Sequence, residues 1–317
     1  MRIAIATLLL VYSCAVSAQT YPTKPVRFIV PYAPGGGADV MARIVAPRLG
    51  AALGQQIIID NRGGAGGNIG SEAGAKAPPD GYTLLLGAAA LTINVSLYSR
   101  LNFDPVKDLT PIALLAKSPN IVVVHPSLPV ASVKDLIALA RARPGQLNYA
   151  SAGSGTTPHL AAELFKTMAK VQIVHVPYNG TSPAMVALMA GEVTLALAPA
   201  LPVLPHVQSG RLRALAITSV TRMPSLPNLP TVSEAALPGF ESAQWYGVLV
   251  PAGTPAAIVS RLNAEIVKIM RLPDVNEQMT RQGSIVVGST PEEFSAYIRA
   301  EIDKWAKVVK ASGAKVE

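Results

Sequence analysis

Short apolar, β-branched runs alternate with stretches of helical periodicity along most of the chain. The runs typical of buried strands are Val26–Val30, Ile57–Ile59, Tyr82–Leu86, Ile121–Val124, Leu147–Ala150, Ile173–Val176, Val193–Ala198, Leu212–Ile217 and Tyr246–Val250. Helical patterns between them predict helices at Val40–Leu53, Val133–Arg143 and Thr157–Ala169. This alternation of strand and helix predicts α/β domains with largely parallel sheets.

The C-terminal part predicts two further helices with clear start signals. The first has Thr254 as its N-cap and Pro255 at its first helical position. The second begins with a capping box formed by Thr290 and Glu293. It carries an apolar stripe that we expect to face the core, made of Phe294, Tyr297, Ile298, Ile302 and Trp305. Between strands, Arg222–Phe240 is rich in proline and leucine and predicts an extended connector.

The first 18 residues have the pattern of a secretory signal peptide. A basic residue, Arg2, precedes the apolar run Ile3–Val16, and Val-Ser-Ala ends the segment. We expect cleavage after Ala18 and export to the periplasm. A lipoprotein with acylated Cys14 and a buried first element are the alternatives, and the bulky Tyr12 disfavours the first of these.

Composition narrows the possible functions of the remaining chain. Cys14 is the one cysteine, so the mature chain has no thiol nucleophile, disulfide or cysteine-ligated metal. With 317 residues, core burial suffices for stability and two domains are expected. The net charge of +8 comes from scattered basic residues and lacks the clustered footprint of a nucleic-acid-binding protein. It suits a small anionic partner but is equally compatible with an ordinary basic surface. After the signal peptide no apolar run reaches the length of a membrane span, which predicts a soluble mature chain.

Three glycine-rich loops follow predicted strands: PYAPGGGAD, DNRGGAGGNIG and ASAGSGTTPHL. None matches the phosphate-binding GxxxxGK[ST] pattern, the dinucleotide GxGxxG fingerprint or the GxSxG nucleophile elbow. They still supply glycine next to helix starts, as before the predicted helices at Val40 and Thr157, where unpaired backbone N–H groups favour anions such as carboxylates. Glycine used only for turns is the alternative, and three such loops at strand ends favour binding.

The candidate reactive residues do not form a catalytic arrangement. His159 and Glu163 are four residues apart on a predicted helix, but no motif supplies a third metal ligand. We therefore expect His159 to make local hydrogen bonds at the helix start. Asp39 and Arg43 are interpreted as a helix cap and an i,i+4 pair. The sequence predicts neither an enzyme nor a protein with a cofactor.

At these same residues the chain resembles the Bug/TctC family, the periplasmic solute-binding receptors of tripartite tricarboxylate transporters. The similar segments run from Tyr21 to the C-terminal part and include YPTKPVRFIVPYAPGGGADVMAR, IIIDNRGGAGGNIGSEAGAKAPPDGYTLLLG, NYASAGSGTTPHLAAELF and HVPYNGTSPAMVALMAGEV. The resemblance implies a two-lobe periplasmic binding protein of type II with crossing hinge strands that closes like a Venus flytrap. We expect residues 19–122 and 249–317 to form lobe 1 and residues 123–248 to form lobe 2.

The resemblance also implies the ligand, the partners and the site. The ligand is a small organic acid anion, and the partners of this monomer are the membrane subunits of a transporter. Its first-lobe contacts correspond to Tyr32, Ala33, Gly36, Gly37, Ala88 and Ala89. Its second-lobe contacts correspond to Ser151, Gly153, Ser154, Thr156, His159 and Tyr178. His159 and Tyr178 are expected to orient the ligand, and Asp39 to hold the first loop.

Two departures from the family pattern bear on the ligand. Thr194 and Ala198 stand where many members carry aspartates, which disfavours an amino-acid ligand because its ammonium group lacks a partner. The segment GAAALTIN offers mostly methyl groups before Thr92, which favours an organic acid with an apolar, even aromatic, portion. Two other functions stay open from the sequence: a receptor that signals through a sensor protein, and an enzyme on the same fold.

Overall fold

The structure is a computed structural model that describes residues 21–178, 181–281 and 283–314. The predicted signal peptide and Cys14 lie outside these residues. The strands are β1 Val26–Val30, β2 Ile57–Asn61, β3 Thr83–Ala88, β4 Leu109–Val124, β5 Asn148–Ser151, β6 Val174–Pro177, β7 Leu195–Pro199, β8 Arg213–Ile217, β9 Ala243–Pro251 and β10 Ile285–Val286. The helices are α1 Gly37–Leu53, η1 Ala65–Gly67, α2 Asn68–Ala75, α3 Ala90–Leu97, α4 Val133–Ala142, α5 Thr157–Ala169, α6 Thr181–Ala190, α7 Ala200–Gln208, α8 Val232–Ala235, α9 Ala256–Met270, α10 Pro273–Arg281 and α11 Pro291–Ser312.

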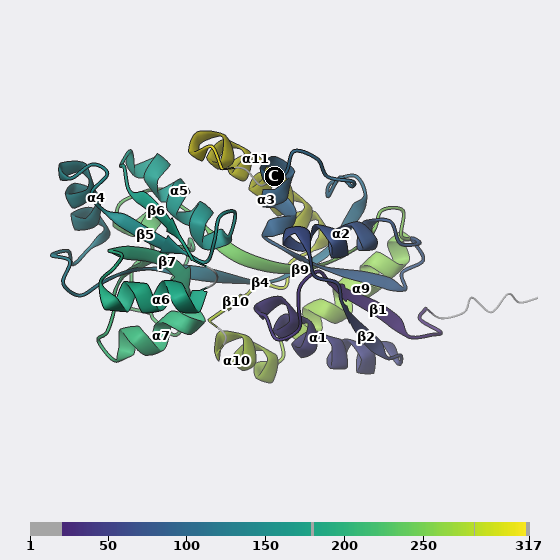
Figure 1. The fold of residues 1–317 in the computed structure, drawn as a ribbon. Helices are drawn as coiled ribbons and strands as arrows, with labels where there is room; N and C mark the ends of the chain where they lie inside the picture. Colours follow the sequence, from purple (N-terminus) through teal and green to yellow (C-terminus); the bar gives the residue numbers. More distant parts are fainter. Residues whose placement is uncertain (1–20, 179–180, 282, 315–317) are drawn as a thin grey trace, which may run out of the picture.

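Two α/β lobes lie side by side and are joined by the long strands β4 and β9 (Figure 1). In lobe 1, β1 pairs in parallel with β2 and β3, and β9 joins antiparallel between β3 and the first part of β4. In lobe 2, the end of β4 pairs antiparallel with β7 and β8, and β5 lies in parallel between β7 and β6. This arrangement confirms the two-lobe α/β fold with crossing strands.

Strand β4 changes partners where it passes from one lobe to the other. Its register with β9 runs from Leu109 to Pro119, and its register with β7 begins at Asn120. The predicted lobe boundaries after residues 122 and 248 both fall inside continuous strands, β4 and β9, and stay a prediction. The largely parallel sheet is corrected to a mixed one, because each crossing strand runs antiparallel to its neighbours.

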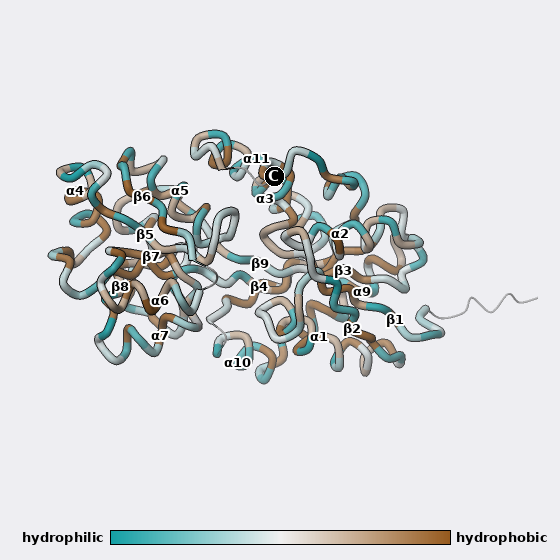
Figure 2. The backbone as a smooth tube through the Cα atoms, in the orientation of Figure 1, coloured by the Kyte–Doolittle hydropathy of each residue, from teal (hydrophilic) through white to brown (hydrophobic). Residues whose placement is uncertain are grey.

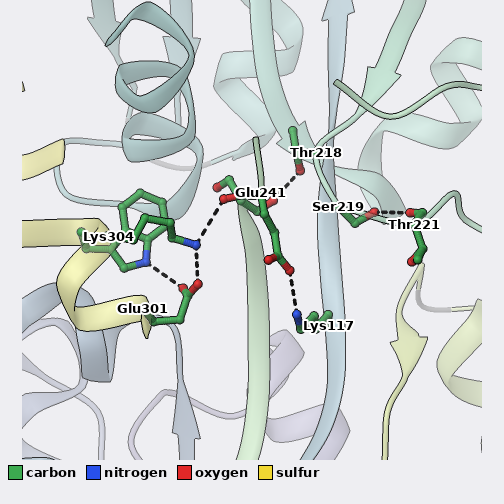
Figure 3. A network of polar contacts seen from close by, with 9 residues as sticks. Lys117, Thr218, Ser219, Thr221, Glu241, Glu301 and Lys304 are labelled. Atoms are coloured by element: carbon green, nitrogen blue, oxygen red, sulfur yellow. Dashed lines mark hydrogen bonds and ion pairs between the residues drawn. The ribbon is translucent and has the colours of Figure 1, made fainter. Parts of the chain in front are cut away.

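A polar network ties the crossing strands to α11 (Figure 3). Lys117 of β4 forms an ion pair of 2.6 Å with Glu241, which lies just before β9. Lys304 of α11 pairs with Glu301 and donates to the Glu241 carbonyl oxygen at 3.2 Å. Because α11 also packs against α3 and α5, it contacts both lobes.

Hydrophobic residues are concentrated in the strands (Figure 2), and the buried cores are built around these strands. One cluster joins β1, β3 and the inner faces of α1 and α9, and another fills lobe 2 between β7 and α6. The predicted stripe of α11 is confirmed as core: Phe294, Ile298 and Trp305 are buried, and Tyr297 and Ile302 pack against them. The capping box of Thr290 and Glu293 is confirmed as well.

Several predicted elements need correction. Helix α1 begins at Gly37, three residues before the predicted Val40, because the glycine loop itself supplies the first turn. The N-cap of α9 is Pro255, since the Thr254 hydroxyl donates to the Pro251 carbonyl instead of accepting from a helix N–H. The connector Arg222–Phe240 contains α8, which has its own capping box. Among the described residues, no helix combines the length and hydrophobicity needed to cross a membrane.

Candidate functional site

A cleft of about 350 Å³ lies between the two lobes, at the ends of their parallel strands. All three glycine-rich loops reach it: the loop before α1 with Tyr32, the loop before α2 with Gly66, and the loop before α5 with Ser154 to Thr156, which Thr157 and Pro158 of α5 continue. The fold therefore brings together three segments that are widely separated in the sequence. The volume suits a small molecule.

The loop before α1 is held by Asp39, which lies in the first turn of the helix. Its buried carboxylate accepts hydrogen bonds from the Gly35 backbone N–H at 2.9 Å and from Asn61 Nδ2 at 3.0 Å, and it pairs with Arg43 at 2.7 Å. These donors, Arg43 first, lower the pKa of Asp39 to about 2. The predicted i,i+4 pair and loop-holding role are confirmed, but the N-cap residue itself is Gly36.

The loop before α5 is held in the same way by His159. The Gly155 backbone N–H donates to His159 Nδ1 at 3.0 Å, which fixes the neutral ring with its proton on Nε2. Burial, and then the neighbouring His175, lower the pKa of His159 to about 4. His159 is thus neutral at pH 7, and the predicted local hydrogen bond is confirmed.

A column of stacked rings lies behind this loop. His159 stacks on His175 with ring centroids 4.2 Å apart, and His175 stacks on Tyr149 at 4.8 Å. The Tyr149 hydroxyl donates to the buried Glu163 at 2.6 Å, and Lys166 pairs with the same carboxylate oxygen at 2.6 Å. Glu163 is therefore already paired. Within the described residues, no group of three or more His, Cys, Asp or Glu side chains could hold a metal ion.

Helix α3 forms the apolar wall of the cleft in lobe 1. Ile93 and Leu97 line the cleft together with Tyr98, which follows the helix. Asn94 donates from Nδ2 to the Gly66 carbonyl at 3.1 Å and to Asn68 Oδ1 at 2.8 Å. The wall is thereby fixed to the second glycine-rich loop.

The floor of the cleft comes from the crossing strands and the end of β7. Asn120 of β4, Gln244 of β9 and Pro199 of β7 line it. Gln244 Oε1 accepts a hydrogen bond from the Thr157 hydroxyl at 2.9 Å, so the floor is joined to the first turn of α5. Among the residues that the structure describes, those that line the cleft carry neither positively nor negatively charged side chains.

The predicted site residues fall into two groups. Tyr32, Ser154 and Thr156 line the cleft. The others surround or support it: Ala33 and Gly36 are exposed on the loop before α1, Gly37 is exposed at the first position of the helix, and Ala88, Ala89, Ser151 and His159 are buried. Gly153 and Tyr178 flank Ser151, whose carbonyl accepts from the Tyr178 N–H at 3.1 Å.

Contacts within the glycine-rich loops explain why particular residues occur at some of these positions. Thr156 is the N-cap residue of α5, and its hydroxyl donates to the Gly153 carbonyl at 2.7 Å. The Ser151 hydroxyl lies 2.7 Å from His175 Nε2, which links the loop to the ring column. At Gly37 a Cβ atom would lie 2.5 Å from the hydroxyl of buried Tyr246, so glycine is required by space. Burial raises the pKa of Tyr246 to about 12.

Sequence reasoning missed the wall of α3 and the floor residues Asn120 and Gln244. The one available signal for the wall was the apolar segment GAAALTIN after β3. Thr194 does not reach the cleft, because its hydroxyl donates to the carbonyl of Asn148 at the start of β5. Ala198 is buried beside Ile121. A larger hollow of about 750 Å³ on α1 and β2 is formed by lobe 1 alone.

Comparison with known proteins agrees with this geometry. Residues 41–314 match the family described as tripartite tricarboxylate transporter family receptor. The protein BugT of Bordetella pertussis is 40% identical over 304 residues, which cover 95% of this chain and 93% of BugT.

Two solved structures of similar proteins contain small carboxylates. Rpa4515 of R. palustris, solved with adipate, is 40% identical to this chain with a TM-score of 0.77. The matched region covers 92% of this chain and 98% of the Rpa4515 chain. MatC of Rhodopseudomonas palustris, solved with bound malate, is 33% identical to this chain with a TM-score of 0.74. The matched region covers 91% of this chain and 100% of the MatC chain. The periplasmic binding protein BugD, also solved, is 32% identical with a TM-score of 0.75, and the match covers 94% of this chain and 100% of BugD.

Proposed function

This chain belongs to the tripartite tricarboxylate transporter receptor family, and we propose that it captures a small organic carboxylate between its two lobes for uptake. The observation that carries this proposal is the cleft itself, where Tyr32 of the loop before α1 and Gly66 of the loop before α2 line one cavity with the start of α5. Helix N-termini present unpaired N–H groups and the positive end of the helix dipole, which stabilise an anion without a charged side chain.

The proposed contacts are those inferred from the family pattern. Ser154 and Thr156 reach the cleft directly, whereas His159 acts behind them by fixing the Gly155 amide. Tyr178 follows β6, next to the strand that carries Ser151. Carboxylate oxygens would accept hydrogen bonds from backbone N–H and hydroxyl groups here, because those groups are the donors that the loops offer.

The hydrocarbon part of the ligand is proposed to pack on α3. Ile93 and Leu97 supply apolar surface opposite the polar loop of α5. The neutral lining also disfavours an amino-acid ligand, since an ammonium group would lack an anionic partner. An acid with an apolar portion therefore fits this cleft better than a tricarboxylate or an amino acid.

The partners and the lobe division are part of the same proposal. We propose periplasmic capture followed by delivery to the membrane subunits of a tripartite transporter. Lobe 1 would comprise residues 19–122 and 249–317, and lobe 2 residues 123–248. A ligand that contacts both lobes would favour the closed arrangement over the open one by its differential affinity for the two.

Mass spectrometry of the acid that co-purifies with the protein is the direct test. A carboxylate is expected, and a panel of mono-, di- and tricarboxylates in thermal-shift assays then ranks its class. Replacing both His159 and Tyr178 with alanine is expected to weaken binding, whereas Arg222→Ala at an exposed ion pair serves as the control. Stabilisation only by tricarboxylates or amino acids would contradict the apolar subsite. Turnover of the bound acid would contradict a receptor.

A further inference from the structure

Asn120 carries an unpaired amide at the floor of the cleft. The side chain is 1% exposed and lines the cleft, and within the described part of the chain its Nδ2 has no hydrogen-bond acceptor. A buried donor without an acceptor carries the full cost of its lost hydration. Such a group favours a hydrogen-bond acceptor on a molecule bound in the cleft.

The backbone of Asn120 is fully engaged without its side chain. Its N–H donates to the Thr218 hydroxyl at 2.8 Å, and its carbonyl accepts from the Thr218 N–H at 2.9 Å. Asn120 is also the residue at which β4 exchanges β9 for β7 as its partner. The turn of β4 from one lobe to the other is therefore held by the main chain, which leaves the amide free for another role.

Other buried polar atoms without partners lie away from the cleft. Ser242 Oγ, Trp245 Nε1 and Tyr297 OH are such atoms near the crossing strands, and none of these residues lines the cleft. Asn120 thus combines two independent features, an unsatisfied donor and a place in the cleft wall. Gln244, on the same floor, is already engaged, because its Oε1 accepts from the Thr157 hydroxyl and its side chain also hydrogen-bonds Tyr246.

We propose that Asn120 is a ligand-binding residue whose amide donates a hydrogen bond to an oxygen of the bound carboxylate. This inference rests on the proposed function and adds a residue from the crossing strands to the loop contacts. A neutral donor at this place selects an oxygen acceptor, either an ionised carboxylate or a carbonyl group. The ligand would then contact the loops of both lobes and the floor that joins them.

The test compares three variants in calorimetric titrations. The probe is whichever of adipate, malate and linear C3–C8 monocarboxylates stabilises the wild type most. Asn120→Ala is expected to lower affinity about tenfold, the loss of one hydrogen bond to a charged group. Asn120→Asp keeps the shape but replaces the donor with a carboxylate, and about a hundredfold loss is expected. Ser242→Ala removes an unpaired hydroxyl outside the cleft and is expected to bind like the wild type.

The unliganded melting temperature separates a binding role from a structural one. Because Nδ2 has no acceptor, N120A is expected to melt within a few degrees of the wild type without ligand and to show a smaller rise with it. If the wild type binds a probe and N120A and N120D bind it equally well, the inference is wrong and the proposed function stands. If no probe binds the wild type, both fail. If N120A does not fold, the isosteric N120D decides between these outcomes.

Discussion

The loops before α1 and α5 are closed by the same hydrogen bond, made by two different side chains. In lobe 1 the Gly35 N–H donates to Asp39, and in lobe 2 the Gly155 N–H donates to His159. In both cases the acceptor lies four residues after the glycine and in the first turn of the helix. The two lobes therefore share a loop geometry without sharing a charge.

The residues around the two acceptors explain the difference. Four residues after Asp39 lies Arg43, which pairs with it, whereas four residues after His159 lies Glu163, which pairs with Tyr149 and Lys166. A carboxylate at position 159 would meet a like charge there. A neutral ring avoids this, and it also leaves the N-terminus of α5 without an adjacent negative charge. Lobe 2 thus offers the more favourable helix end to an anion.

The strongest test of this difference between the lobes is to replace the neutral acceptor of lobe 2 with the carboxylate that lobe 1 uses. His159→Asp is expected to lower the free energy of unfolding by about 3 kcal/mol at pH 7, because a buried charge lacks a cationic partner. His159→Asn keeps an acceptor for Gly155 without a charge and is the control. Urea unfolding at pH 7 measures both, and equal stability of the two variants would refute the charge argument.

Removal of the lobe 1 acceptor has the next largest expected effect. Asp39→Ala leaves the Gly35 N–H and the Arg43 side chain without their acceptor and the Asn61 amide with the Tyr32 carbonyl alone, and a loss of about 2 kcal/mol is expected. Asp39→Asn retains one oxygen acceptor and is expected to lose about half as much. Urea denaturation of the two variants beside the wild type is the measurement. An alanine variant no less stable than the asparagine variant would show that the carboxylate does not hold the loop.

A methyl group tests the space at the start of α1. Gly37→Ala would bring a Cβ to 2.5 Å from the Tyr246 hydroxyl but 3.5 Å from the ring carbon that bears it. We expect Gly37→Ala to cost about 1–2 kcal/mol and the addition of Tyr246→Phe to recover most of it. Thermal unfolding of the single and double variants forms the cycle. If the stability effects of Gly37→Ala and Tyr246→Phe simply add in the double variant, the new methyl group and the Tyr246 hydroxyl are not in contact.

The pH dependence of stability gives the smallest expected effect. The pKa of His159 falls from 6.5 to about 4 on folding, so its neutral form stabilises the native state above pH 6.5, and that stability is lost as the pH falls toward 4. Burial lowers the pKa of His175 as well, which adds to the loss in the same range. For Asp39 the pKa falls from 3.8 to about 2, so its contribution is lost only between those values.

Calorimetric melting at several pH values distinguishes the pH range in which His159 titrates from the lower range in which Asp39 titrates. Between pH 6.5 and 5 the wild type is expected to lose about 1 kcal/mol more than His159→Asn. Asp39→Asn is expected to follow the wild type over that range and to depart from it below pH 4. Parallel curves for the wild type and the histidine variant would contradict a buried neutral His159.

Much of each lobe could be predicted from local pattern. Strand β1 and helix α5 have the predicted bounds, and the capping box of α11 formed as its residues indicate. The first part of β4 was missed, because Leu109–Asn120 contains two prolines and four polar residues and lacks a clear period. Its pairing with β9 requires a segment more than a hundred residues away, which no local pattern reports.

By itself the sequence determined most of the strands and several helices, the glycines that open the helix starts, and the resemblance to a receptor family. Those features are local, because they depend on periodicity, capping and backbone freedom. Only the tertiary structure decided that α3 forms a wall, that His159 is neutral against His175, and that Asn120 lies unpaired at the floor. Burial and partner choice set these properties, and both depend on which distant segments the crossing strands bring together.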